Sequence, residues 1–237
     1  MVEVGDSFDQ YADGSYLSTH PEWHAERAPW KAEIIVNLLT RNAISPRSIL
    51  DVGCGTGQVL HHVSTALPNL ESAIGLEPSP DAPNQIPPGS IAERQPVALE
   101  DSDAIADVAM LIDVLEHVED YYTLLRRLGE RCQHLVLHVP LELTAMAALR
   151  PSVLGKTRTA VGHIHTFSRS TLLWTLEDAG FHVIDHDVTG AAFDGPDRDP
   201  RKPQVFVRKA INAVSPLLVE RALGGCSFMV LAEPRSR

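Results

Sequence analysis

Residues 48–60 read Ser-Ile-Leu-Asp-Val-Gly-Cys-Gly-Thr-Gly-Gln-Val-Leu. The first five residues favour a short apolar strand, and the alternating glycines Gly53, Gly55 and Gly57 lead into an amphipathic helix. Glycine lacks the Cβ atom that would keep a ligand away from the main chain, and it adopts backbone conformations that other residues avoid. The stretch therefore predicts a strand, a tight turn and a helix, with a ligand held against the turn.

Two ligand classes fit a glycine turn between a strand and a helix, and the spacing of the glycines separates them. A dinucleotide fingerprint has the spacing Gly-x-Gly-x-x-Gly and seats a pyrophosphate at the helix N-terminus. This chain has Gly-x-Gly-x-Gly instead, with Asp51 two residues before the first glycine. A carboxylate at this position repels a pyrophosphate and attracts a cation such as the ammonium group of an amino acid. The pattern favours a cationic ligand over a dinucleotide.

A second acidic residue, Glu77, closes the next predicted strand (71–77). It follows the glycine turn by roughly 20 residues, a separation suited to hydrogen bonds from both hydroxyls of a ribose. The run from Asp51 to Gly57 resembles the first motif of the class I S-adenosylmethionine-dependent methyltransferases. This resemblance implies S-adenosylmethionine as the cofactor, S-adenosylhomocysteine as the product and Glu77 at the ribose. The methionine part would lie against Asp51 and the turn residues Gly53, Cys54, Gly55 and Gly57.

Apolar runs and helical patterns alternate along the rest of the chain. Further strands are predicted at 107–112, 134–139, 181–184 and 228–231, and helices at 27–41, 59–67, 118–128 and 168–176. Six prolines between Pro78 and Pro96 exclude a long helix there and leave the third strand poorly marked. The alternation favours an α/β fold with a doubly wound, mostly parallel sheet. With the resemblance, we expect the seven-stranded, Rossmann-like methyltransferase fold.

The segment before the first strand is unusually rich in aromatic residues, which include Phe8, Tyr11, Tyr16 and Trp23. We expect residues 1–44 to form an N-terminal arm and helical lid, and residues 45–237 to form the cofactor-binding methyltransferase domain. The arm either folds over the cofactor or packs against the sheet edge, and the sequence leaves both readings open.

Composition narrows the classes of partner. The 237 residues carry a formal net charge of -11, which argues against a nucleic-acid phosphate backbone as a routine partner. Cys54, Cys132 and Cys226 have no disulfide or zinc-cluster spacing. The sequence contains no apolar run of membrane-spanning length. We expect a cytoplasmic protein with a small-molecule acceptor; the sequence does not indicate an oligomeric state.

Residues 111–120, Leu-Ile-Asp-Val-Leu-Glu-His-Val-Glu-Asp, are similar to the signature after strand four in a large group of bacterial small-molecule methyltransferases. Residues 162–168, Gly-His-Ile-His-Thr-Phe-Ser, resemble a later segment of the same group. The resemblance implies that Ile112 and Asp113 lie beside the sulfonium end of the cofactor. It also implies an acidic residue near the adenine amino group, for which Asp101 is the favoured candidate.

Methyl transfer needs an aligned nucleophile, exclusion of water and, for some acceptors, removal of a proton. A histidine near the end of the fourth strand suits a general base because its pKa lies near neutral pH. His117 is the first candidate, followed by His163, and then by His165 and His138. A purely structural role for these histidines remains the alternative.

A metal site is a further hypothesis. Asp113, Glu116 and His117 share one face if a helix begins by Asp113, and His163 or His165 would complete a donor set for a divalent ion. The arrangement resembles an element of metal-dependent small-RNA 2′-O-methyltransferases and of ubiquinone-biosynthesis O-methyltransferases. In the alternative reading, Glu116 caps a helix and His117 packs in the interior.

The favoured function is S-adenosylmethionine-dependent methyl transfer to an oxygen or nitrogen of a small molecule. A nicotinamide-dependent oxidoreductase and a non-catalytic S-adenosylmethionine-binding module remain as alternatives. The glycine spacing and Asp51 disfavour the oxidoreductase.

Overall fold

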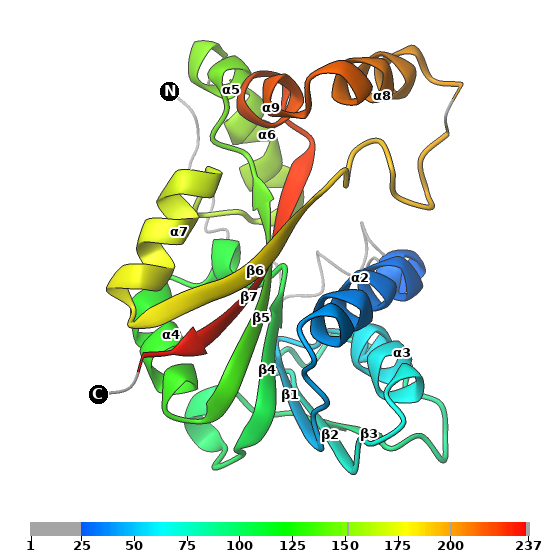
Figure 1. The fold of residues 1–237 in the computed structure, drawn as a ribbon, viewed down its shortest axis with the longest axis vertical. Helices are drawn as coiled ribbons and strands as arrows, with labels where there is room; N and C mark the ends of the chain where they lie inside the picture. The colour runs from blue at the N-terminus through cyan, green and yellow to red at the C-terminus, as the bar shows by residue number, and fades with distance from the viewer. Residues whose placement is uncertain (1–24, 151, 200, 236–237) are drawn as a thin grey trace.

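The computed structural model describes residues 25–150, 152–199 and 201–235, and these form a seven-stranded sheet with helices on both faces (Figure 1). The strand order is β3-β2-β1-β4-β5-β7-β6. Strand β7 is antiparallel to β5 and β6, whereas β3, β2, β1, β4 and β5 pair in parallel. The predicted doubly wound, mostly parallel α/β sheet is confirmed.

The strands lie close to their predicted positions. Their bounds are β1 (Ser48–Val52), β2 (Ser72–Leu76), β3 (Ala92–Gln95), β4 (Ala106–Ile112), β5 (Cys132–Leu141), β6 (Phe181–Thr189) and β7 (Cys226–Pro234). Strand β4 is buried along almost its whole length, as expected of a central strand covered on both faces. No helix separates β2 from β3, which confirms what the prolines of that segment predict.

Two pairs of helices cover the two faces of the sheet. Helices α2 (Ala28–Arg41) and α3 (Gln58–Ala66) pack on one face through a cluster that includes Ile35 and Leu60. Helices α4 (Tyr121–Gly129) and α7 (Arg169–Asp178) pack on the other through a cluster that includes Leu125 and Leu172. Ser168 caps α7 by accepting a hydrogen bond from the backbone of Thr171.

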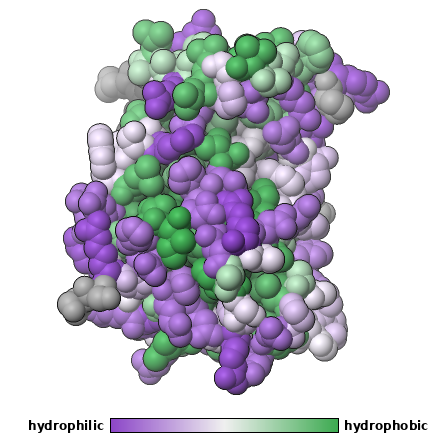
Figure 2. All heavy atoms as spheres, viewed as in Figure 1, coloured by the Kyte–Doolittle hydropathy of each residue, from purple (hydrophilic) through white to green (hydrophobic). Residues whose placement is uncertain are grey.

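A group of short helices lies beyond the C-terminal end of β5, at the upper end of Figure 1. These cap elements are α5 (Ala145–Leu149), α6 (Ser152–Val161), α8 (Pro203–Val214), α9 (Pro216–Leu218) and the π-helical turn η5 (Val219–Leu223). Figure 2 shows several apolar side chains gathered at this end, and exposed ones among the cap elements include Leu149, Phe206 and Val214.

Three 3-10 turns complete the elements of residues 25–150, 152–199 and 201–235: η2 (Ala25–Arg27), η3 (Leu99–Asp101) and η4 (Leu115–His117). No helix begins by Asp113, so the condition under which Asp113, Glu116 and His117 would share one helical face is not met. Asp113 has a φ of +58°, which a helix excludes, and Glu116 and His117 lie instead on the turn η4. Helix α4 begins later, behind the cap residue Asp120.

The N-terminal arm falls mostly outside the described residues, and so do its aromatic residues from Phe8 to Trp23. Of the proposed segment 1–44, the structure describes η2 and α2, so the proposed domain boundary and the lid role of the arm stay predictions. Within the described residues, no helix combines the length and apolarity needed to cross a bilayer.

Candidate active site

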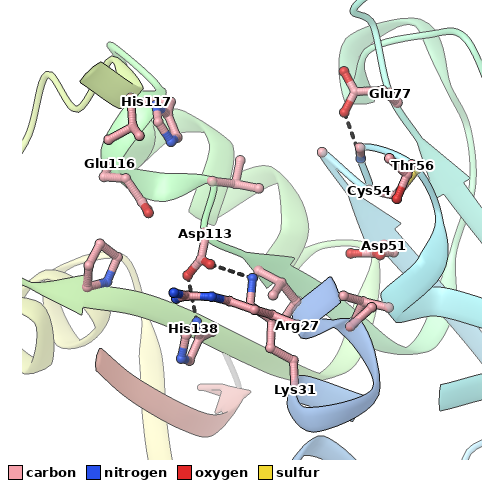
Figure 3. A pocket seen from close by; sticks show the side chains of 18 of the residues that line it. Arg27, Lys31, Asp51, Cys54, Thr56, Glu77, Asp113, Glu116, His117 and His138 are labelled. Atoms are coloured by element: carbon pink, nitrogen blue, oxygen red, sulfur yellow. Dashed lines mark hydrogen bonds and ion pairs between the residues drawn. The ribbon is translucent and has the colours of Figure 1, made fainter. Parts of the chain in front are cut away.

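A cavity of about 870 Å³ opens where β1, β2, β4 and β5 end. Figure 3 shows Asp51, Cys54, Thr56 and Glu77 on one side, and Glu116 and His117 on the other. Asp113 lies between the two groups. The cavity is thus placed at the C-terminal strand ends, where ligands of open α/β sheets bind.

The glycine turn needs glycine at its first and last positions. Gly53, Gly55 and Gly57 have φ values of +73°, +54° and +77°. A Cβ atom at Gly53 would lie 2.6 Å from Val114 Cγ2, and one at Gly57 would lie 2.5 Å from Ile86 Cδ1. The packing of the turn against neighbouring side chains thus requires these glycines, besides any contact with a ligand.

Asp51 lines the cavity from β1 and is only 1% exposed. Its Oδ1 atom has no hydrogen-bond partner among the described residues. Burial, and then the nearby charge of Glu77, raise the pKa of the Asp51 carboxyl to about 8. A cationic group in the cavity would therefore favour ionisation of Asp51 and meet an oxygen with unfilled acceptor capacity.

Glu77 follows β2 and holds the glycine turn in place. Its Oε2 accepts a hydrogen bond from the Gly55 amide at 2.8 Å, and its Oε1 accepts one from the Ser79 amide at 2.8 Å. Each carboxylate oxygen can accept a further hydrogen bond. Glu77 thus lines the cavity in a fixed orientation with acceptor capacity left for a ligand.

Asp113 forms a network that the sequence did not predict. Its Oδ2 accepts a hydrogen bond from Lys31 Nζ of helix α2 at 2.6 Å, and its Oδ1 lies 2.6 Å from His138 Nδ1 of β5. The other ring nitrogen of His138 lies 3.1 Å from Thr189 Oγ1 on β6. Burial opposes ionisation of Asp113, but Lys31 and His138 hold the pKa of the carboxyl well below its ordinary value.

Glu116, His117 and His163 converge on the opposite side of the cavity, and each offers one ligand atom within 4.8 Å of the others. Glu116 is 1% exposed, and neither oxygen of its carboxylate has a hydrogen-bond partner among the described residues. Burial, and then the charge of Asp113, raise the pKa of the Glu116 carboxyl well above its ordinary value. Asp113 does not belong to this cluster, contrary to the predicted ligand set.

Hydrogen bonds fix both histidine rings of the cluster. His117 Nδ1 lies 3.2 Å from the Gly162 carbonyl, to which it donates, so its Nε2 is left as an acceptor. His163 Nδ1 lies 2.9 Å from Glu142 Oε2, and its Nε2 lies 3.9 Å from Glu116 Oε1. Burial, and then repulsion from His163, lower the pKa of His117 to about 4.

The remaining predicted residues divide into those that reach the cavity and those that do not. Cys54, Ile112 and His138 line it. Asp101 does not, because the turn η3 places Leu99 in the core, Glu100 at the cavity and Asp101 in solvent. His165 packs edge-on against Tyr121 outside the cavity lining.

The sequence analysis missed Lys31, Glu142 and Arg198, which also line the cavity. Lys31 interrupts the apolar face of helix α2, four residues before the buried Ile35. A lone cation in such a face could have indicated a buried ion pair or a site residue. Glu142 and Arg198 lie in segments where no motif or periodicity marked them as site residues.

The comparisons with known proteins agree with this fold. A family model described as a methyltransferase domain matches residues 23–186. No curated protein matches the chain by sequence.

Solved structures of methyltransferases share the fold at low sequence identity. A magnesium protoporphyrin IX methyltransferase from Synechocystis with bound S-adenosylhomocysteine is 15% identical, with a TM-score of 0.58 over 88% of this chain and 83% of that one. A plantazolicin methyltransferase, in complex with S-adenosylhomocysteine and a substrate analogue, is 13% identical, with a TM-score of 0.61 over 97% and 94%. A putative Haloferax volcanii methyltransferase, in complex with the activator Trm112, is 16% identical, with a TM-score of 0.64 over 99% and 100%.

The match to the family model covers more than half of the chain, and the sheet is that of these methyltransferases. The resemblance to the class I S-adenosylmethionine-dependent methyltransferases is confirmed, and the chain belongs to the methyltransferase domain family.

Proposed function

We propose that the chain transfers the methyl group of S-adenosylmethionine to an oxygen or nitrogen atom of a small-molecule acceptor. The observation that carries the proposal is the single cavity that joins the glycine turn to the cluster of Glu116, His117 and His163. A volume of about 870 Å³ accommodates a cofactor together with a small acceptor.

The chemistry of the cavity wall suits the parts of this cofactor. The ammonium group of the methionine part would meet Asp51, whose Oδ1 lacks a partner among the described residues. The ribose hydroxyls would donate to Glu77. Glu100, rather than Asp101, borders the cavity where the adenine would lie. Asp113 stands between these groups and the histidines, and Ile112 lines the same cavity. Both residues would lie beside the transferred methyl group.

For proton removal from the acceptor, we propose His163 as the general base. Its Nδ1 hydrogen is donated to Glu142 Oε2, which leaves the lone pair of Nε2 on the side of Glu116. A carboxylate behind an imidazole fixes its tautomer and stabilises the protonated ring. His117 is less suited as the base because burial lowers its pKa to about 4.

A divalent metal ion is the second chemistry that fits the same three residues. The favouring observation is the Glu116 carboxylate, which is buried with neither oxygen hydrogen-bonded among the described residues. Glu116 together with Nε2 of His117 and of His163 would hold the ion, and Glu142 and the Gly162 carbonyl already orient the two rings. When bound, the ion would supply a positive charge that holds and acidifies an acceptor hydroxyl.

Metal analysis separates these two chemistries. The protein would be dialysed against EDTA, and its affinity for Zn²⁺ and Mn²⁺ measured by calorimetry. The metal hypothesis predicts one site that Glu116→Gln weakens at least tenfold, whereas Glu119→Gln, an exposed neighbour, leaves it unchanged. If no metal site depends on Glu116, the metal hypothesis is contradicted and His163 remains as the proposed general base.

The methyl-transfer proposal is tested with labelled cofactor. An extract of the source cells is separated by ultrafiltration into a small-molecule fraction and a macromolecular fraction. Each fraction is incubated with the protein and methyl-labelled S-adenosylmethionine. We expect label in the small-molecule fraction with the natural chain and little with Asp51→Asn. Label confined to protein or nucleic acid would contradict the small-molecule acceptor, and no label in any fraction would favour the non-catalytic binding module.

A further inference from the structure

A second cavity, of about 250 Å³, lies beside the first, and the two share part of their walls. The shared residues are Arg27, Pro140, Glu142, Ala191, Arg198 and Ser227. The far side of the second cavity is built by the cap elements, with α5, α6 and the turn η5 contributing Met146, Leu154 and Leu223. The second cavity is therefore a continuation of the active site into the cap.

The charged side chains that line the second cavity are mostly cationic. Three arginines line the second cavity, Arg27, Arg198 and Arg208, against one carboxylate, Glu142, which already accepts from His163. The whole chain carries a formal net charge of -11, so the concentration of arginine here runs against its overall composition.

Within the described residues this positive charge is paired only in part, although Glu26 also acts on Arg198 through its charge. Asp197 lies outside the lining of both cavities, and it serves two guanidinium groups at once: Arg27 Nη2 at 2.7 Å and Arg198 Nε at 3.4 Å. Arg27 Nε is buried and has no hydrogen-bond partner among the described residues. Arg208 Nε donates to the Gly224 carbonyl at 3.3 Å, and within residues 25–150, 152–199 and 201–235 no ion pair joins Arg208 to a carboxylate.

We propose that these arginines bind an acidic group of the acceptor, a carboxylate or a phosphate, while the apolar part of the acceptor lies against the cap. Guanidinium groups present donors in a planar fork that matches the oxygens of either anion. An anion would compensate the partly buried charge, because an unpaired buried charge costs free energy. Met146, Val153, Leu154 and Leu223 supply the apolar wall.

The arrangement separates the anchoring group from the reacting group. Arg27 and Arg198 stand where the two cavities meet, whereas Glu116, His117 and His163 line the first cavity but not the second. Figure 3 shows Arg27 beside Lys31 and Asp113 on the cavity wall. An acceptor held by its acidic group would thus present its other end to the histidines and the methyl donor. This inference rests on the proposed function and narrows the acceptor to amphipathic acids.

The test uses the full chain saturated with S-adenosylhomocysteine and probes that differ in one group. Octanoate, octyl phosphate and octanamide are titrated by calorimetry. We expect at least one of the two anions to bind at least tenfold more tightly than the amide, and the stronger anion identifies the acidic group. Arg198→Gln and Arg208→Gln should each weaken binding of the anion about tenfold. Arg208 lines only the second cavity, so Arg208→Gln should leave the affinity for S-adenosylhomocysteine unchanged.

Arg201→Gln is the matched control, because Arg201 lies near Arg198 in the sequence, is 89% exposed and lines neither cavity. Its affinity for the anion should equal that of the natural chain. Equal binding of octanoate, octyl phosphate and octanamide, or anion binding that survives both arginine substitutions, would overturn the inference. Failure to bind S-adenosylhomocysteine would instead count against the proposed function, so the two failures are distinguishable.

Discussion

Asp51 and Glu77 face the same cavity from the ends of the neighbouring strands β1 and β2. Asp51 is the more deeply buried of the two, and its carboxyl gains no hydrogen bond at Oδ1 from the described residues. Ionisation of Asp51 is therefore costly in the protein alone and becomes favourable when a cation approaches. We therefore expect Asp51 to couple the protonation state of the site to the binding of a ligand with an ammonium group.

This coupling predicts that the affinity for S-adenosylhomocysteine rises with pH. The pKa of Asp51 is raised to about 8, so the carboxyl is mostly protonated at pH 6 and about half ionised at pH 8. The folded protein without ligand retains this proton, whereas the unfolded chain releases it at lower pH. The contribution of Asp51 to the free energy of unfolding therefore falls as pH rises from the ordinary pKa of the carboxyl towards 8. Binding of the ligand at neutral pH releases the proton. Calorimetry should show affinity increasing about fivefold from pH 7 to pH 8.

The Asp51→Asn variant is the control for this pH dependence. It should bind S-adenosylhomocysteine more weakly, with an affinity that no longer changes between pH 6 and pH 8. A natural chain whose affinity is flat over that range would show that Asp51 does not meet the ammonium group.

Glu77 gives a second prediction at the scale of a residue. Glu77→Gln replaces one acceptor oxygen by an NH₂ group, which then faces either the Gly55 amide or the Ser79 amide, both donors. We expect a loss of about 1.5–3 kcal/mol in affinity for S-adenosylhomocysteine, roughly 10- to 100-fold. Glu93→Gln, on the exposed side of β3, should leave the affinity unchanged. An unaltered affinity in Glu77→Gln would remove Glu77 from the ribose site.

At the scale of an element, helix α2 is joined to the end of β4 by the pair of Lys31 and Asp113. The Lys31 side chain is 10% exposed and the Asp113 side chain 35%, so solvent screens this pair only in part. Asp113 also has a φ of +58°, which is costly for a residue other than glycine. The network with Lys31 and His138 holds Asp113 in this conformation.

A double-mutant cycle measures this connection. Lys31→Met, Asp113→Asn and the double variant are unfolded in urea, and we expect a coupling free energy of about 1–3 kcal/mol. The exposed pair Arg47 and Glu71, treated with alanine substitutions in the same way, should show no measurable coupling. Strictly additive effects of Lys31→Met and Asp113→Asn would mean that the pair does not fasten α2 to the sheet.

The same pair shows where sequence reasoning reaches its limit. Asp51, the glycine turn and Glu77 lie within one strand-turn-helix-strand unit, so their spacing along the chain predicts their position at the sheet edge. Lys31 and Asp113 meet across 82 residues. Neither spacing nor periodicity reports such a contact, and the assumption of a helix at Asp113 failed because its backbone is left-handed.

At the scale of the whole molecule, the sheet could be predicted and the cap could not. Strand β4 is a nearly continuous apolar run, broken only by Asp107, and buried parallel strands leave this signature in the sequence. Helix α6 has no buried residue, so its sequence carries no strong apolar stripe to predict it. The cap nevertheless shapes the second cavity, which means that the determinants of acceptor choice lie in the part of the chain that sequence patterns describe least.

The arrangement of the molecule also explains how one cavity could serve two ligands. The proposed cofactor-binding residues Asp51 and Glu77 lie at the ends of β1 and β2, and the histidine cluster lies on the other side of the cavity, with Asp113 between them. The order of strands β2, β1, β4 and β5 across the sheet places donor and acceptor side by side at one edge.

We propose that Asp51 and the glycine turn bind the cationic amino-acid part of S-adenosylmethionine, and two parallel calorimetric titrations decide whether they do. S-adenosylhomocysteine and NAD are titrated separately into the full chain. We predict that S-adenosylhomocysteine binds at one site per chain, that Asp51→Asn weakens this binding, and that NAD gives no saturable heat. Saturable binding of NAD without binding of S-adenosylhomocysteine would contradict the account.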